Sequence, residues 1–380
     1  MDEKQFSKDS PGSLVRATSM TGLDWAFVPN SLSAYTFDST LWPLIAKSHA
    51  SLGTLNGIGQ TLNEPRLLLK PLQNREAITS SRIEGTYVTP EQLILFELNP
   101  PEKSEQEKSS VTDWIEVHNY GLALTTGVRL LDEMPLCNRL LKEMHKVLMR
   151  GVRGKEKTPG EFRKQQVQIG YNARFVPPPP TEVSRLMDEL EKQINSQTDI
   201  DPLIKCFLVH YQFETIHPFL DGNGRIGRAL LSLMIYKEMG HKWPWLYMSA
   251  YYDKNKDDYI NSLYNVSSKN HWSHWLDFCL RGLISQADDS IRRCNEFNRL
   301  KKEYHERVTN PTPRTHQIIE DLFIEPFLNL TGLAKKCGVT YPTAKSDVDL
   351  LMKHEILFEL SHKKPKVFYA KEVFTTAYRD

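Results

Sequence analysis

The chain has 380 residues, and at about 100 to 200 residues per domain we expect two or three domains. Its composition, 40% hydrophobic and 25% charged with a formal net charge of +1, is typical of a globular protein and excludes a chain built to bind polyanions through bulk charge. The sequence contains no run of about 18 apolar residues, and its start has no basic stretch followed by an apolar one, so we expect a cytoplasmic protein without a membrane partner.

Breaker residues divide the chain into three parts, and we expect a mainly α fold. The first, residues 1–100, is expected to be a helical region ending at Asn99-Pro100-Pro101 and a charged linker over 102–109. The second part covers 110–307. The third, 312–380, follows a proline-containing stretch that is typical of a domain boundary.

Within the second part, apolar residues recur at helical spacing over 140–148 and 203–211. Strand-like segments are few. Residues 166–169 and 174–176, separated by a short turn sequence, predict a β-hairpin. The proline run at 177–180 should stop this hairpin and start a helix directly after it.

The segment from His217 to Arg228, HPFLDGNGRIGR, carries more chemistry than any other. Three glycines within six residues free the backbone, so that amide groups and the start of the following helix can converge on an anion. Arg225 and Arg228 are one turn apart and can face the same polyphosphate. Asp221 offers an oxygen ligand that Mg²⁺ accepts, and His217 can take a proton near neutral pH. The segment predicts a phosphate-binding loop beside a general base.

Plainer interpretations of this segment exist. His217 alone would more often be a core histidine, and a lone GNG more often a tight turn; it is the combination that favours the chemical interpretation. A structural metal site would need four side chains on one helix face, namely His210, Glu214, His217 and Asp221. Pro218 should end that helix, and the HExxH spacing is missing, which disfavours such a site. The phosphate-binding sequence GxxxxGK[ST] is also missing.

The third part predicts helices around 318–323, over 330–337 and over 340–352, followed by a hairpin of 358–360 with 367–369. This order resembles a winged helix-turn-helix domain whose third helix would be the recognition helix. Charge is nearly balanced, because ten Lys and Arg face nine Asp and Glu from Thr312 onward. DNA binding therefore has little electrostatic support. Three lysines in the wing could contact phosphates or simply be solvated: Lys363, Lys364 and Lys366.

The segment 217–228 matches the signature HxFx[D/E]GNGRxxR at every fixed position, and the chain therefore resembles the Fic family. Residues 160–163, GEFR, followed by QVQIG at 166–170, resemble the flap hairpin of that family. The likeness covers about residues 35–290. It implies a Fic-type helical core that transfers AMP from ATP, with Mg²⁺, to a Ser, Thr or Tyr hydroxyl of another protein.

The resemblance also implies a role for each motif residue. His217 would deprotonate the target hydroxyl, Asp221 would hold Mg²⁺, and Gly222, Asn223 and Gly224 would surround the α-phosphate. Arg225 would hold the β-phosphate region, and Arg228 would reach the γ-phosphate. Tyr252 and Tyr259 could border the adenine, with core packing as the alternative. The nucleotide-binding residues expected are Gly222, Asn223, Gly224, Arg225, Ile226, Gly227, Arg228, Ile169, Gly170, Tyr252 and Tyr259.

The sequence SSRIEG at 80–85 resembles the inhibitory motif [S/T]xxxE[G/N] of the same family. Ser80 and Glu84 are one helical turn apart, and Glu84 would pair with Arg228 and so occupy the group that ATP needs. A solvent-exposed glutamate at a helix end is the alternative.

Several partners follow from the resemblance. A target protein would lie along the flap through main-chain pairing, self-modification is expected, and a homodimer is implied. The alternative function is a DNA-binding regulator whose Fic core senses nucleotide. A pure dimerisation scaffold would leave the complete motif unexplained.

Overall fold

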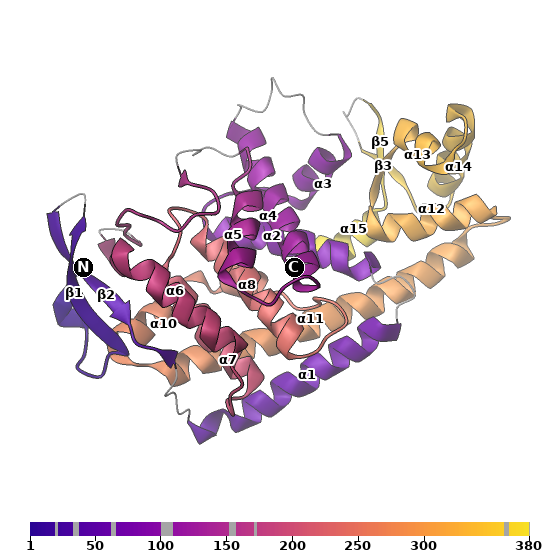
Figure 1. Ribbon diagram of the computed structural model, residues 1–380. Coiled ribbons are helices and arrows are strands. Elements are labelled where there is room, and N and C mark those ends of the chain that lie inside the picture. Colours follow the sequence, from indigo (N-terminus) through magenta and orange to yellow (C-terminus); the bar gives the residue numbers. More distant parts are fainter. Residues whose placement is uncertain are drawn as a thin grey trace.

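A computed structural model describes residues 1–19, 22–32, 38–61, 66–99, 109–151, 157–170, 173–360 and 365–379. Helices dominate the described chain, and two small antiparallel sheets accompany them, which confirms the expected mainly α fold (Figure 1). The linker expected over 102–109 lies outside the described residues except for Ser109. Every described helix is too short or too polar to span a lipid bilayer.

The chain starts with a β-hairpin that the sequence analysis missed. β1 (Gly12–Ser19) pairs with β2 (Gly22–Pro29) in an antiparallel register that sets Arg16 opposite Trp25. β-Branched and aromatic residues over 14–18 and 25–28 were the available signal. The first hundred residues are therefore not purely helical. This hairpin lies at one end of the molecule (Figure 1), where β2 contacts α7 (Pro202–Ile216).

The helices of the first part follow. They are α1 (Trp42–Thr61), α2 (Arg66–Ile83) and α3 (Pro90–Leu98). α3 begins with a capping box, in which the Thr89 side chain accepts from the Gln92 N–H and the Gln92 side chain accepts from the Thr89 N–H. α2 packs on α4, α9 and α12, so it lies inside the assembly of helices rather than on its surface.

The central helices include α7, which packs on α6, α8, α10 and α11. They are α4 (Ser109–Leu131), α5 (Asn138–Leu148), α6 (Pro180–Asn195), α7 (Pro202–Ile216), α8 (Asn223–Glu238), α9 (Ser249–Lys254), α10 (Lys256–Lys269) and α11 (Trp272–Arg307). The predicted helices over 140–148, 203–211 and after the proline run are confirmed. The Asp201 side chain caps the start of α7. The residues of α7 are buried on nearly every side of the helix.

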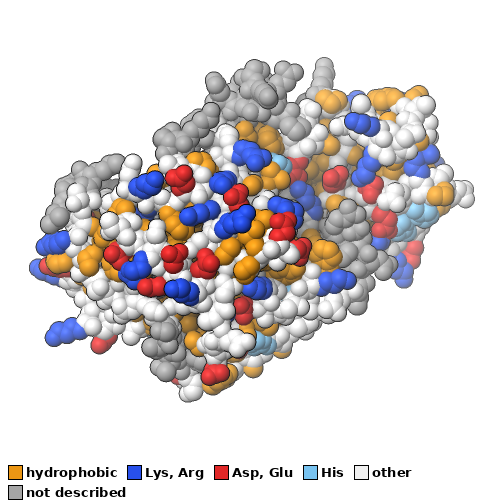
Figure 2. All heavy atoms as spheres, in the orientation of Figure 1, with side chains coloured by type: hydrophobic (Ala, Val, Ile, Leu, Met, Phe, Trp, Pro, Cys, Tyr) orange, Lys and Arg blue, Asp and Glu red, His pale blue; other side chains and the backbone are white. Residues whose placement is uncertain are grey.

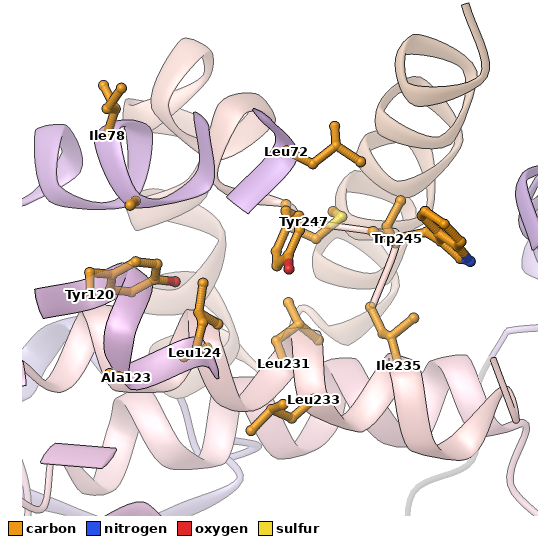
Figure 3. Packing of buried hydrophobic residues seen from close by; sticks show 14 of the residues in the cluster. Leu72, Ile78, Tyr120, Ala123, Leu124, Leu231, Leu233, Ile235, Trp245 and Tyr247 are labelled. Atoms are coloured by element: carbon orange, nitrogen blue, oxygen red, sulfur yellow. The ribbon is translucent and has the colours of Figure 1, made fainter. Parts of the chain in front are cut away.

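Most of the core among the described residues is one hydrophobic cluster that extends from α1 to α15, and two small clusters accompany it. Figure 3 shows part of it, with Leu72 of α2, Tyr120 and Leu124 of α4, and Leu231 of α8 between the helices. α2 is therefore held by burial along its length, and the residues at its C-terminal end have a fixed position.

The flap is less regular than the predicted hairpin. Only Ile169 and Phe175 form a β-bridge, with N–O distances of 2.8 and 3.1 Å, so the ladder predicted over 166–169 and 174–176 is wrong in extent. The ladder is shorter than predicted because Val176 pairs elsewhere. Its carbonyl accepts from the Phe27 N–H of β2 at 2.9 Å. The second flap strand thus pairs outward with β2 beyond the bridge. Tyr171 and Asn172 lie outside the described residues.

The last part confirms the predicted helices and second hairpin and adds one strand and one helix. Its elements are α12 (Pro313–Ile324), β3 (Phe327–Asn329), α13 (Leu330–Cys337), α14 (Tyr341–Lys353), β4 (Phe358–Leu360), β5 (Val367–Tyr369) and α15 (Lys371–Tyr378). The strands form an antiparallel sheet in the order β3-β5-β4. The 36-residue α11 runs from the central helices to this part (Figure 1).

Charged side chains of both signs are interspersed over the face drawn in Figure 2. This pattern agrees with the near-zero net charge and offers no extended basic area on that face.

Candidate active site

The candidate base His217 stands where α7 ends. It has a left-handed backbone, with φ 52° and ψ 61°. Its Nδ1 lies 3.2 Å from the carbonyl oxygen of Glu214, and because a carbonyl only accepts, Nδ1 carries the proton. The other ring nitrogen, Nε2, therefore has a free lone pair. Burial lowers the pKa of His217 to about 4, so the ring is neutral at pH 7.

The glycine-rich loop is folded by its own asparagine. Asn223 accepts from the Phe219 N–H at 2.7 Å and donates to the Phe219 carbonyl at 2.8 Å. Gly222 precedes α8 with φ 75°, a conformation that side chains disfavour. The first N–H groups of α8 have no intrahelical acceptor, and the positive end of the helix dipole adds to them. This turn is suited to an anion.

The buried His145, which the sequence analysis did not identify, supports this loop. Gly160 donates its N–H to Nδ1 of His145 at 2.8 Å, so the proton of this ring is on Nε2 and is donated to the Asp221 carbonyl at 3.0 Å. The ring stacks on Phe219 at a centroid distance of 3.9 Å. Burial lowers the pKa of His145 to about 4. Its neutral form thus joins α5, the segment at Gly160 and the motif loop.

Replacing His145 by phenylalanine keeps the stack but leaves the Gly160 N–H and the Asp221 carbonyl without partners. We expect a loss of about 1–3 kcal/mol of unfolding free energy for each group. Urea denaturation measures this loss, with Glu143→Ala on the exposed side of the same helix as the control. A His145→Phe protein as stable as the wild type would contradict the assigned role.

The carboxylate of Asp221 is surrounded by positive charge. It accepts from the Gly222 N–H at 2.6 Å, forms an ion pair with Lys157, and lies 3.7 Å from Arg225. Burial raises its pKa, but Lys157 and Arg225 outweigh this effect, and the pKa lies below its usual value. Arg225 also reaches Glu116 at 3.3 Å.

Asp221 fits Mg²⁺ in the way that nucleotide enzymes use this ion, with one carboxylate and the remaining ligands from water and phosphates. A cation, the Lys157 ammonium, already lies against this carboxylate, and the Asp221 side chain is 35% exposed. Among the described residues, no cluster of three or more metal-binding side chains occurs, and the four-residue site on one helix face is not formed. His210 instead bonds the Gly227 carbonyl and Tyr259.

Arg228 is buried and bound by the end of α2. Its Nε and Nη2 donate to the side-chain and backbone oxygens of Ser80, both at 2.9 Å, and Nη2 donates to Glu84 at 2.8 Å. The Glu84 carboxylate lies directly over Gly224, where a Cβ would collide with it. Burial opposes the charge of Glu84, yet Arg228 outweighs this effect and the pKa of Glu84 is lowered.

These groups border one cavity of about 380 Å³. Of the predicted site residues, its lining contains Glu84, Ile169, Gly170, His217, Gly224, Arg228 and Tyr259. Asp221, Gly222, Asn223 and Arg225 belong to the motif loop outside this lining. Ile226 and Tyr252 are fully buried, and Tyr252 stacks on Tyr259 at 4.3 Å, which is the core-packing alternative. Gly227 and Ser80 do not belong to the lining. The Gly227 carbonyl bonds His210, and the Ser80 hydroxyl accepts from Arg228.

Glu214 lines the same cavity and was considered before only as a metal ligand. Its Oε1 is buried and has no hydrogen-bond partner among the described residues. Burial raises the pKa of Glu214 to about 8, so the side chain is a neutral acid at pH 7.

Glu214→Gln is expected to become more stable than the wild type as the pH rises from about 4.5 to 8. In this range the folded wild type holds a proton that the unfolded chain releases, so its stability falls by up to about 1.4 kcal/mol per pH unit. The amide does not titrate. Denaturant unfolding of both proteins at pH 5 and pH 8.5 measures the difference. A constant difference between the two pH values would show that Glu214 is ionised in the folded state.

Comparison with known proteins supports this picture. Residues 135–235 match the profile of the Fic/DOC family, and residues 42–129 match that of the Fic/DOC family N-terminal region. A protein adenylyltransferase Fic of Drosophila ananassae is 32% identical over 130 residues, which are 32% of this chain and 25% of that protein. A probable protein adenylyltransferase of Aquifex aeolicus (strain VF5) is 40% identical over 77 residues, 20% of this chain and 24% of that protein.

The match thus spans about a quarter of the length of these curated relatives. A solved Fic family protein from Desulfovibrio desulfuricans G20 aligns with a TM-score of 0.55 and 21% identity, over 88% of this chain and 97% of that chain. This likeness shows the shared fold.

Proposed function

We propose that this chain, which carries a Fic/DOC family domain at residues 135–235 and a Fic N-terminal region at 42–129, is a protein adenylyltransferase. It would transfer AMP from ATP to a Ser, Thr or Tyr hydroxyl of a target protein. The observation that carries the proposal is a neutral imidazole with a free Nε2, placed on the same cavity as the start of α8 and Arg228.

In the reaction, Nε2 of His217 takes the proton of the target hydroxyl. The hydroxyl oxygen then bonds to the α-phosphorus while the bond from that phosphorus to the bridging oxygen breaks, and pyrophosphate leaves with the electron pair. The N–H groups at the start of α8 stabilise the charge that develops on the α-phosphate. Arg225 and Arg228 would bind the β- and γ-phosphates.

Asp221 would hold Mg²⁺, with the Lys157 ammonium displaced from the carboxylate. When bound, the cation supplies positive charge against the leaving pyrophosphate. Glu84 would act as an inhibitor, because it occupies Arg228 and covers Gly224. ATP could then enter the cavity only in an unproductive pose.

The target would pair with the flap through main-chain hydrogen bonds along residues 166–170, because the other side of the flap is taken by β2. Self-modification and a homodimer remain predictions. So does the division of the chain into 1–100, 110–307 and 312–380, and the cytoplasmic location.

A second candidate function is a DNA-binding regulator. The order of helices and strands from α12 to β5 fits a winged helix-turn-helix, with Tyr341 and Lys345 exposed on α14. Lys366 is paired with Glu359 at 2.9 Å, and Lys363 and Lys364 lie outside the described residues. The electrostatic support for DNA is therefore small.

Three measurements test these functions. Calorimetry of Glu84→Gly with ATP and Mg²⁺ should show binding, and incubation with α-labelled ATP should label the enzyme or a target in a cell extract. A protein that binds no adenine nucleotide after this substitution is not an adenylyltransferase. A gel shift with genomic fragments at physiological salt tests the regulator.

A further inference from the structure

We propose that Arg163 is the positioning residue of the catalytic base, an assignment that rests on the proposed function and deepens it. Arg163 belongs to the segment between Gly160 and the flap, and its side chain is only 2% exposed. Burial lowers the pKa of its guanidinium to about 10, so it is still a cation at pH 7. Among the described residues no carboxylate pairs with this cation, and its side-chain nitrogens donate to backbone carbonyls instead.

Arg163 binds three consecutive carbonyl oxygens around His217. Its Nη2 donates to the Ile216 carbonyl at 3.3 Å, its Nε to the His217 carbonyl at 2.8 Å, and its own backbone N–H to the Pro218 carbonyl at 2.8 Å. Nη2 also reaches the Pro178 carbonyl at 2.6 Å. The Ile216, His217 and Pro218 carbonyls belong to the end of α7 and the turn after it, where intrahelical donors run out.

The contacts explain how His217 can hold its backbone. A left-handed conformation is unfavourable for a residue with a Cβ, and glycine cannot replace an imidazole that is needed for proton transfer. Such a conformation persists only where its surroundings fix it. The planar guanidinium of Arg163 holds the Ile216 and His217 carbonyls, which flank the Cα of His217. It therefore fixes the direction in which the imidazole leaves the backbone.

The same cation acts on the charge of the base. Burial is the first cause of the low pKa of His217, and the positive charge of Arg163 lowers it further. The carboxylates of Glu84 and Asp221 act in the opposite direction. Among the described residues, the charged and titratable groups at the cavity, the loop or the backbone of His217 are Arg163, Glu84, Arg174, Glu214, Asp221, Arg225, Arg228, Lys256, Tyr259 and Tyr264. Of these, Arg163 is the cation bound to the backbone of His217 itself.

The test compares Arg163→Gln and Arg163→Lys in the Glu84→Gly background, with the adjacent exposed Lys164→Gln as the control. We expect Arg163→Gln to lower kcat about 100-fold, the effect of a small misplacement of a reacting group, while the KM for ATP changes less than about threefold. The acidic limb of the rate profile should move to higher pH. Arg163→Lys keeps the charge and the backbone bond to the Pro218 carbonyl, but one ammonium cannot replace the guanidinium at the Ile216, His217 and Pro178 carbonyls together. The acidic limb of its rate profile should therefore stay in place while kcat falls at least about tenfold.

Histidine ¹⁵N NMR provides a readout without turnover, with the His217 signal assigned by its loss in His217→Ala. The expected result is a higher pKa of His217 in Arg163→Gln than in the parent. Parental kcat in a folded Arg163→Lys, or an unchanged His217 titration in Arg163→Gln, overturns the proposal. If Glu84→Gly itself transfers no AMP, the proposed function fails, and the NMR titration still decides the role of Arg163.

Discussion

Replacing His217 by alanine is expected to lower the rate of AMP transfer by about 10²- to 10⁴-fold, the usual contribution of a positioned general base. The free Nε2 is lost, while the start of α8 and both arginines remain. Calorimetry should therefore give nearly the same affinity for ATP. Single-turnover transfer from α-labelled ATP, in the Glu84→Gly background, measures the rate.

The matched control is His274→Ala, which removes an exposed histidine of α11. This variant should transfer AMP at the parental rate. If His217→Ala did so as well, with its fold intact by circular dichroism, the hydroxyl would have to be deprotonated by another group and the assignment of the base would be wrong.

Replacing Glu84 by glycine should raise AMP transfer by about 10- to 100-fold. The estimate follows from the about 1.5–3 kcal/mol that a hydrogen bond to a charged group contributes, which Arg228 would then be free to give to the γ-phosphate. The Glu84 side chain is 40% exposed, which places the expected gain toward the lower end of this range. Labelling with α-labelled ATP over time measures the change.

Glu84→Gln separates charge from volume. It still covers Gly224 but has no charge to pair with Arg228, so we expect an intermediate rate. Glu133→Gly, which removes an exposed glutamate paired with Arg129, should leave the rate unchanged. Equal rates for the wild type, Glu84→Gly and Glu84→Gln would exclude an inhibitory role.

Local sequence predicted those elements whose pattern depends on near neighbours. The apolar spacing of α5 and α7 and the prolines before α6 gave helices close to the observed ones, and both strands of the hairpin β4–β5 were placed correctly. The flap was predicted as too regular, since the pairing of Val176 with Phe27 depends on a strand far away in the chain. No local pattern announces such a contact.

The site shows the same limit. The residues of HPFLDGNGRIGR were found because one segment carries them all. His145, Arg163 and Glu214 were not found as functional residues, because their importance comes from the carbonyls and N–H groups, or the cavity, that the fold brings to them. Each looks ordinary in its own helix or loop. Tyr252 is the opposite example: the sequence analysis offered it as an adenine contact, but its side chain is buried in the core.

α2 contacts the last part of the chain and leads directly into the active site. At one position it donates from Asn74 to the Tyr378 hydroxyl of α15 at 3.2 Å, and just beyond its end Glu84 reaches Arg228. A molecule that binds near α15 and favours a shifted α2 would change the affinity for nucleotide by some factor. By thermodynamic reciprocity, nucleotide would change the affinity for that molecule by the same factor. Affinity measured at either end would report on the other.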